Sequence, residues 1–99
     1  MSLDRTKILR NLPKKGFKKV ESGHHIYFHH VYQGKETGPY TFVSHSAKIK
    51  TYDAKLVSKM RSQLRLDHNK QVQDLCNCPM SGADYNEILI SNGIFKQTD

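Results

Sequence analysis

The sequence has few of the residues that build large cores or covalent cross-links. It contains no tryptophan, two cysteines and three prolines, and 36% of its 99 residues are hydrophobic. A chain of this length and composition predicts one domain with a modest core, and at most a small appendage. Cys76 and Cys78 are one residue apart, too close to close a useful loop, so we expect free thiols in a reducing compartment.

Long apolar runs are missing as well. No stretch approaches the roughly 20 apolar residues that a membrane span requires. The N-terminal stretch MSLDRTKILRNLPKKG is basic and amphipathic, and it lacks the continuous apolar centre of a secretion signal. We therefore expect a cytoplasmic protein with no membrane partner.

Acidic residues are scarce in the first two thirds of the chain. Residues 1–66 hold 14 lysines and arginines against 4 acidic residues, a net charge of +10, whereas residues 67–99 hold 2 against 5, a net charge of −3. A basic body with a mildly acidic tail favours a polyanion as the partner of the body. The alternative is a soluble basic surface without a specific ligand.

The hydrophobic pattern predicts an α+β fold with the order α-β-β-β-α. The expected elements are a helix over 3–12, strands over 17–21, 24–32 and 40–45, and a helix over 52–66. The strands are expected to form a three-stranded antiparallel sheet. The connection at 33–39 contains two glycines and a proline, which predicts a hairpin longer than the tightest type. The second helix is expected to bury Leu56, Val57, Met60 and Leu64.

Residues 67–99 predict a C-terminal extension of two helices. The first has an apolar face formed by Val72, Leu75 and Cys76; the second has one formed by Tyr85, Ile88 and Leu89. Ser81 and Asp84 resemble a capping box at the start of the second helix, and Gly93 is expected just after its end. Both faces need a covering surface, which is either the 1–66 body or a second copy in a homo-oligomer.

The stretch SGHHIYFHH, residues 22–30, holds four of the six histidines, namely His24, His25, His29 and His30. They could bind a metal, transfer protons or serve as polar residues of a strand. On a strand, residues four apart are separated by roughly 13 Å and neighbours point to opposite faces, so one ion cannot collect several of them. His68 with Cys76 and Cys78 matches no usual zinc spacing. We expect no metal and no cofactor, and the other two interpretations stay open for each histidine.

Residues 6–66 follow a distinctive order of motifs. A short basic helix is followed by Gly-Phe and a hydrophobic position, namely Gly16, Phe17 and Val20. A histidine then leads into an aromatic strand, and a later strand ends in a second histidine. These residues are His24, Ile26, Tyr27 and His45, followed by the helix pattern of Leu56, Val57, Met60 and Leu64. In this order and spacing, residues 6–66 resemble the HicA (YcfA-like) toxin family of toxin–antitoxin systems. Ser22-Gly23 reverses the family's usual order at the turn, and Val43 stands at a common proline position.

The resemblance implies a double-stranded-RNA-binding-like fold for residues 1–66, ribosome-independent cleavage of mRNA, and inhibition by a HicB-type antitoxin. RNA supplies its own nucleophile, the 2′-OH, so cleavage needs proton transfer and charge stabilisation but no metal. By this match His24 is expected to be the general base, whereas His25, His29 and His30 are expected to be ordinary residues of the strand. His45 is the second candidate, orienting the phosphate or protonating the leaving 5′-oxygen. The residues expected to contact RNA are Lys14, Lys15, Lys18, Lys19, Gly23, Lys48 and Lys50.

Three functions therefore compete at the level of sequence. The first is a toxin that cleaves mRNA, the second a non-catalytic RNA-binding module, and the third an adaptor whose basic surface meets an acidic protein. A histidine at the turn favours the first. The reversed Ser22-Gly23 and the extension at 67–99 leave room for the other two.

Overall fold

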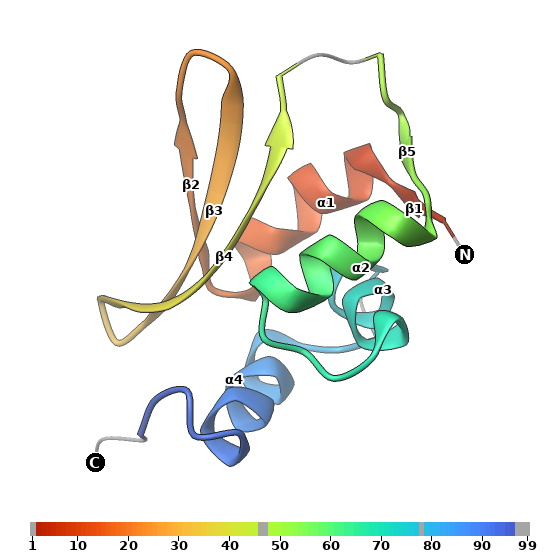
Figure 1. Ribbon diagram of the computed structural model, residues 1–99. Coiled ribbons are helices and arrows are strands. Elements are labelled where there is room, and N and C mark those ends of the chain that lie inside the picture. Colours follow the sequence, from red (N-terminus) through yellow and green to blue (C-terminus); the bar gives the residue numbers. More distant parts are fainter. Residues whose placement is uncertain (1, 46–47, 78, 97–99) are drawn as a thin grey trace.

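The computed structural model describes residues 2–45, 48–77 and 79–96. The elements are β1 (Leu3–Asp4), α1 (Arg5–Asn11), the 3-10 helix η1 (Leu12–Lys15), β2 (Phe17–Glu21), β3 (His25–Tyr32), β4 (Lys35–Ser44), β5 (Thr51–Tyr52), α2 (Ala54–Gln63), α3 (Asn69–Asn77) and α4 (Gly82–Ser91). The fold is α+β, and β2, β3 and β4 form the predicted three-stranded antiparallel sheet in that order. Figure 1 shows the helices gathered on one side of this sheet.

Both helices of the body start later than predicted, because a second, two-stranded sheet takes their first residues. Leu3 pairs with Tyr52 in the β1–β5 ladder, and both side chains are buried. Asp53 then begins α2, where its carboxylate accepts the N–H of Leu56 at 3.0 Å. A pairing between segments so far apart in sequence has no local signature, so the hydrophobic pattern of each segment alone suggested helix.

The β3–β4 connection is shorter than predicted. Only Gln33 and Gly34 form the turn, and both have positive φ, 51° and 81°. Two such residues are typical of the tight hairpin turn whose twist matches that of its strands. Gly38 and Pro39, which suggested a longer loop, lie within β4 where its register with β3 shifts. A bulge of this kind accommodates glycine and proline within a strand.

One face of the sheet, here called the inner face, packs against the helices. Its buried residues Ile26, Phe28 and Val43 join a cluster that also contains Ile8 of α1 and Val57 of α2. The predicted apolar stripe of α2 is confirmed, since Val57, Met60 and Leu64 are buried and Leu56 packs partly against the same cluster.

The C-terminal extension packs on the body of the same chain. Val72, Leu75 and Cys76 are buried in the same cluster as the body residues. The phenol of Tyr85 donates to the carbonyl oxygen of Leu64 at 2.7 Å, at the end of α2. The apolar faces of residues 67–99 are thus covered by the 1–66 body, which is one of the two surfaces expected for them.

The ends of α4 follow the predicted pattern. Asp84 N–H donates to the Ser81 hydroxyl at 3.0 Å and Ser81 N–H to the Asp84 carboxylate at 3.1 Å, which confirms the capping box. Gly93 has a φ of 75°, and the N–H of Ile94 donates to the carbonyl oxygen of Leu89 at 2.9 Å.

Cys76 is a free thiol, and its burial raises the pKa of the thiol to about 12. Cys78 lies outside the described residues.

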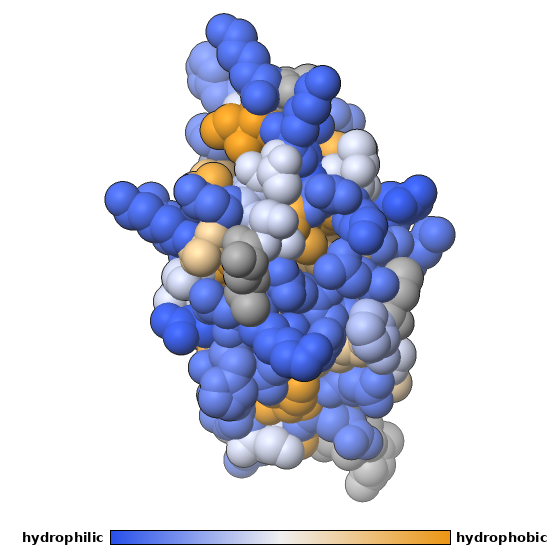
Figure 2. Space-filling view, turned by 90° about the vertical axis from the view of Figure 1, so that its right-hand side faces the viewer, coloured by the Kyte–Doolittle hydropathy of each residue, from blue (hydrophilic) through white to orange (hydrophobic). Residues whose placement is uncertain are grey.

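Figure 2 views the molecule from the right-hand side of Figure 1, where β1, β5 and the helices lie. This face is mainly hydrophilic, with separate hydrophobic spots. None of the helices that the structure describes is both long and apolar enough to traverse a bilayer.

Candidate functional site

The β2–β3 turn and the end of β4 meet at one end of the sheet (Figure 1). Ser22 closes the turn, with its N–H 2.9 Å and its hydroxyl 3.1 Å from the carbonyl oxygen of His25. Across the strands, the N–H of His45 donates to the carbonyl oxygen of His24 at 3.2 Å. The structure therefore brings the two predicted catalytic residues next to each other, and both are exposed. We call this region the histidine end of the sheet.

The ring of His45 is held by the turn. Its Nε2 lies 2.7 Å from the carbonyl oxygen of Ser22. A carbonyl oxygen only accepts hydrogen bonds, so Nε2 carries a proton and donates it to this contact. In the neutral ring Nδ1 is then the nitrogen that can accept a proton. His45 is thus an oriented imidazole at the exposed end of β4.

Arg5 of α1 holds the same end of β4 from the side of the helices. Its Nη2 donates to the carbonyl oxygens of Ser44 at 2.7 Å and His45 at 3.4 Å. Its backbone N–H donates to the carbonyl oxygen of Lys50 at 2.9 Å. Its Nε is buried and has no hydrogen-bond partner among the described residues. Because its partners lie some 40 residues away, no local sequence pattern pointed to Arg5. It adds a permanent positive charge beside the histidines.

Two hollows border the histidine end. The first is mainly aromatic and aliphatic, lined by His25, Phe42, Val43, Ser44, Ile49, Tyr52 and Leu56. The second, here called the polar hollow for its residue types, is lined by Asp4, Arg5, Thr6, Lys50 and Thr51. Burial raises the pKa of the Tyr52 phenol, while a hydrogen bond with the Ser44 backbone and the charge of Arg5 oppose that rise. The phenol of Tyr52 therefore stays protonated at neutral pH.

Three of the residues predicted to contact RNA lie near these histidines. Gly23 belongs to the β2–β3 turn, directly before His24, and is exposed. Lys48 and Lys50 are exposed in the segment that leads from His45 to β5, and Lys50 lines the polar hollow. Gly23 is thus part of the histidine end, and Lys48 and Lys50 follow it in the segment after β4.

The other predicted lysines lie further away. Lys18 and Lys19 are exposed in β2, and Lys14 is exposed in η1, which precedes β2 at the opposite end of the sheet. From its first to its last residue β2 extends about 13 Å, at about 3.3 Å per residue. These cations therefore form a basic edge that runs along β2 toward His24.

Lys15 is the one predicted RNA contact that the structure places in the interior. It is only 8% exposed, and its ammonium donates to the carbonyl oxygens of Leu75, at 3.1 Å, and Met80. The nearby Asn11 amide donates to the carbonyl oxygen of Cys76 at 2.6 Å. These carbonyls lie at and just beyond the C-terminal end of α3, where unpaired carbonyls favour a cation. Lys15 therefore joins the tail to the body and is not available to RNA.

His30 was predicted to be an ordinary strand residue and is instead completely buried on the inner face. Its Nε2 lies 2.7 Å from Oδ1 of Asn86, and its Nδ1 lies 2.5 Å from the hydroxyl of Thr37. Its ring contacts those of Phe17 and Tyr85, with centroids 5.4 Å and 5.1 Å away. Burial lowers the pKa of His30, partly offset by the Asn86 hydrogen bond. The neutral ring is thus an internal connector between the sheet and α4.

His25 and His29 occupy the opposite, outer face of the sheet and are half-buried. Nδ1 of His29 lies 3.4 Å from the carboxylate of Glu36. Among the described residues, no group of three His, Cys, Asp or Glu side chains is arranged to hold a metal ion.

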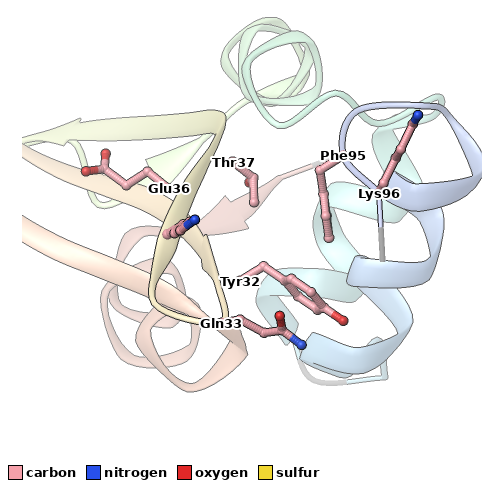
Figure 3. Close-up of a pocket in the computed structure, with 7 residues that line it drawn as sticks. Tyr32, Gln33, Glu36, Thr37, Phe95 and Lys96 are labelled. Carbon is pink, nitrogen blue, oxygen red and sulfur yellow. The ribbon is translucent and has the colours of Figure 1, made fainter. Parts of the chain in front are cut away.

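A further pocket lies at the hairpin end of the sheet, away from His24. It is lined by Tyr32, Gln33, Lys35, Glu36, Thr37, Phe95 and Lys96. In Figure 3 the rings of Tyr32 and Phe95 lie beside each other, with centroids 4.7 Å apart. This pocket marks where the segment after α4 folds back onto the hairpin.

Comparison with known proteins finds no matching family model, no matching curated protein and no matching solved structure.

Proposed function

We propose that this chain is a metal-independent endoribonuclease of the HicA (YcfA-like) type, with a double-stranded-RNA-binding-like fold. The observation that carries the proposal is the hydrogen-bonded pairing of His24 with His45 at an exposed end of the sheet. Arg5 and Lys50 add positive charge there, within a body of net charge +10. Two histidines held next to each other through the backbone, with cations nearby, suit phosphodiester chemistry on a polyanion.

The proposed reaction uses the RNA's own nucleophile. His24 accepts the proton of a ribose 2′-OH, and the 2′-oxygen attacks the adjacent phosphorus. The bond from phosphorus to the 5′-oxygen breaks, and protonated His45 gives a proton to that oxygen. The products are a 2′,3′-cyclic phosphate and a 5′-hydroxyl. Charge that develops on the phosphate is stabilised by the neighbouring cations.

The proposal includes a partner and a compartment. A HicB-type antitoxin would hold the enzyme inactive in the cytoplasm, and mRNA would be its substrate. Residues 1–66 supply the proposed catalytic and RNA-contacting groups. The C-terminal extension adds buried apolar side chains to the core of the body. The hydrogen bond from Tyr85 to the carbonyl oxygen of Leu64 also joins the two parts.

The test is to incubate the purified full chain with a single-stranded RNA and with the same strand made as DNA, with and without EDTA. We expect cleavage of the RNA alone, at the same rate in EDTA, with cyclic phosphate at the new 3′ ends. Binding without cleavage would support a non-catalytic RNA-binding module in its place. Neither binding nor cleavage would reject both and favour an adaptor for an acidic protein.

A further inference from the structure

The outer face of the sheet carries a continuous strip of rings. In the register of β3 with β4, Tyr27 lies opposite Phe42 and His29 opposite Tyr40. The ring centroids of neighbours along the strip are 5.0–5.9 Å apart, for the pairs His25–Phe42, His25–Tyr27, Tyr27–Phe42, Tyr27–His29 and His29–Tyr40. We call these five residues the aromatic strip.

The strip is open to solvent. None of its residues is buried, and no helix lies over this face in Figure 1. Among the described residues, the large hydrophobic side chains that stand exposed are Val20, Tyr40 and Ile49, at 38%, 40% and 48%. Val20 pairs with Tyr27, and Ile49 lines the hollow beside His25, so all three lie on or beside the strip. Contiguous exposed apolar surface of this kind marks an interaction site.

The charges around the strip favour a polyanion. Lys18 pairs with His29 and therefore stands on the same outer face, and Lys48 and Lys50 lie beyond the end that carries His25. One carboxylate also contacts the strip, that of Glu36, 3.4 Å from Nδ1 of His29. An exposed row of rings with lysines beside it on β2 and beyond its His25 end fits a phosphate backbone with its bases turned toward the protein.

The shape of the strip selects unpaired RNA. The deep major groove of an RNA duplex does not admit side chains and its bases are stacked on each other, whereas single-stranded bases are free to stack on protein rings. From His25 to His29 the strip extends about 13 Å along β3 at about 3.3 Å per residue. In RNA-recognition motifs, aromatic side chains on the face of a sheet stack about two or three bases. The strip also ends directly beside His24.

We propose that the aromatic strip is a stacking platform for single-stranded RNA, and that it leads the strand to the histidine end. This inference rests on the proposed function, because it takes RNA as the ligand. Beyond the proposed function, it names the surface that binds RNA, the aromatic strip, and the form of RNA that binds there, a single strand.

The test measures binding of a short, unstructured, 2′-fluoro oligouridine, which cannot be cleaved by 2′-OH attack. Tyr40→Ala and Tyr27→Ala should each weaken binding on the order of ten-fold, since stacking on an aromatic ring dominates such contacts. Tyr40→Phe should bind like the wild type and Tyr40→Leu should not. Tyr32→Ala, which removes a tyrosine packed on Phe95 away from the outer face, is the matched control. Thermal melting of each variant checks that the fold is kept.

The outcomes separate this inference from the proposed function. If the wild-type chain binds no RNA, both fail together. If it binds RNA but Tyr40→Ala and Tyr27→Ala bind equally well, or an RNA duplex of equal length binds as tightly, the platform alone is rejected. If sedimentation shows a wild-type dimer that Tyr40→Ala dissociates without any change in RNA affinity, a second copy covers the strip and the platform is also rejected.

Discussion

The two ends of the central sheet use the same residue types in opposite ways. At the histidine end, His24 and His45 are exposed and joined through the backbone. At the hairpin end, His30 is completely buried between Thr37 and Asn86, and Lys15 is enclosed by carbonyl groups of the tail. An imidazole or ammonium group is thus left exposed at one end and buried at the other, depending on which parts of the chain pack against it.

The largest effect on stability is expected where the tail meets the body. Lys15→Met removes the ammonium and leaves the carbonyl oxygens of Leu75 and Met80 buried without a donor. Such a loss costs about 2–3 kcal/mol of unfolding free energy. Its neighbour Lys14 is exposed, so Lys14→Met should change stability by less than about 0.5 kcal/mol. Urea unfolding of the two variants measures the contrast; equal stabilities would contradict the role assigned to Lys15.

The same junction can be tested without touching a charge. A Cβ at Gly82 would lie 2.9 Å from the carbonyl oxygen of Lys15, whereas a Cβ at Gly23 would meet nothing within 4 Å. Gly82→Ala should therefore destabilise the protein by about 1–3 kcal/mol through overpacking. Gly23→Ala should be nearly neutral or slightly stabilising. A Gly82→Ala protein that melts at the wild-type temperature would show that α4 does not pack here.

A smaller effect is expected from pH at His30. Burial lowers its pKa in the folded state below the ordinary value of 6.5, so the unfolded chain binds the proton more readily. The stabilising contribution is complete above pH 6.5 and is lost as pH falls from there toward the lowered folded pKa. His30→Gln should flatten this part of the stability profile, and His68→Gln, at an exposed position, should not. Unchanged pH dependence in His30→Gln would contradict the neutral, buried ring.

The elements set by local periodicity could be predicted from the sequence, namely the three strands, the stripe of α2 and the capping box at Ser81. Contacts across the chain could not. Lys14 and Lys15 have the same local surroundings, and only the end of α3, 60 residues further on, makes Lys15 a buried residue. His30 likewise depends on Asn86, 56 residues away.

The candidate site divides in the same way. His24 and His45 came from the family resemblance, which follows order and spacing along the chain. Arg5 was missed because its contacts with Ser44 and His45 arise only when α1 packs beside the end of β4. The tight turn at Gln33 was missed because glutamine is not among the residues typical of positive φ.

The most direct test of the contrast between the two ends is the single-turnover rate of RNA cleavage by His24→Ala, compared with His68→Ala and the wild type. We predict that His24→Ala loses about 10²–10⁴-fold in rate, because the proposed general base is removed. Its melting temperature should be unchanged and its RNA affinity should stay within a few-fold, while His68→Ala cleaves normally. Cleavage by His24→Ala at the wild-type rate, or a His29→Ala protein that is the inactive one, would contradict the assignment of the chemistry to the histidine end.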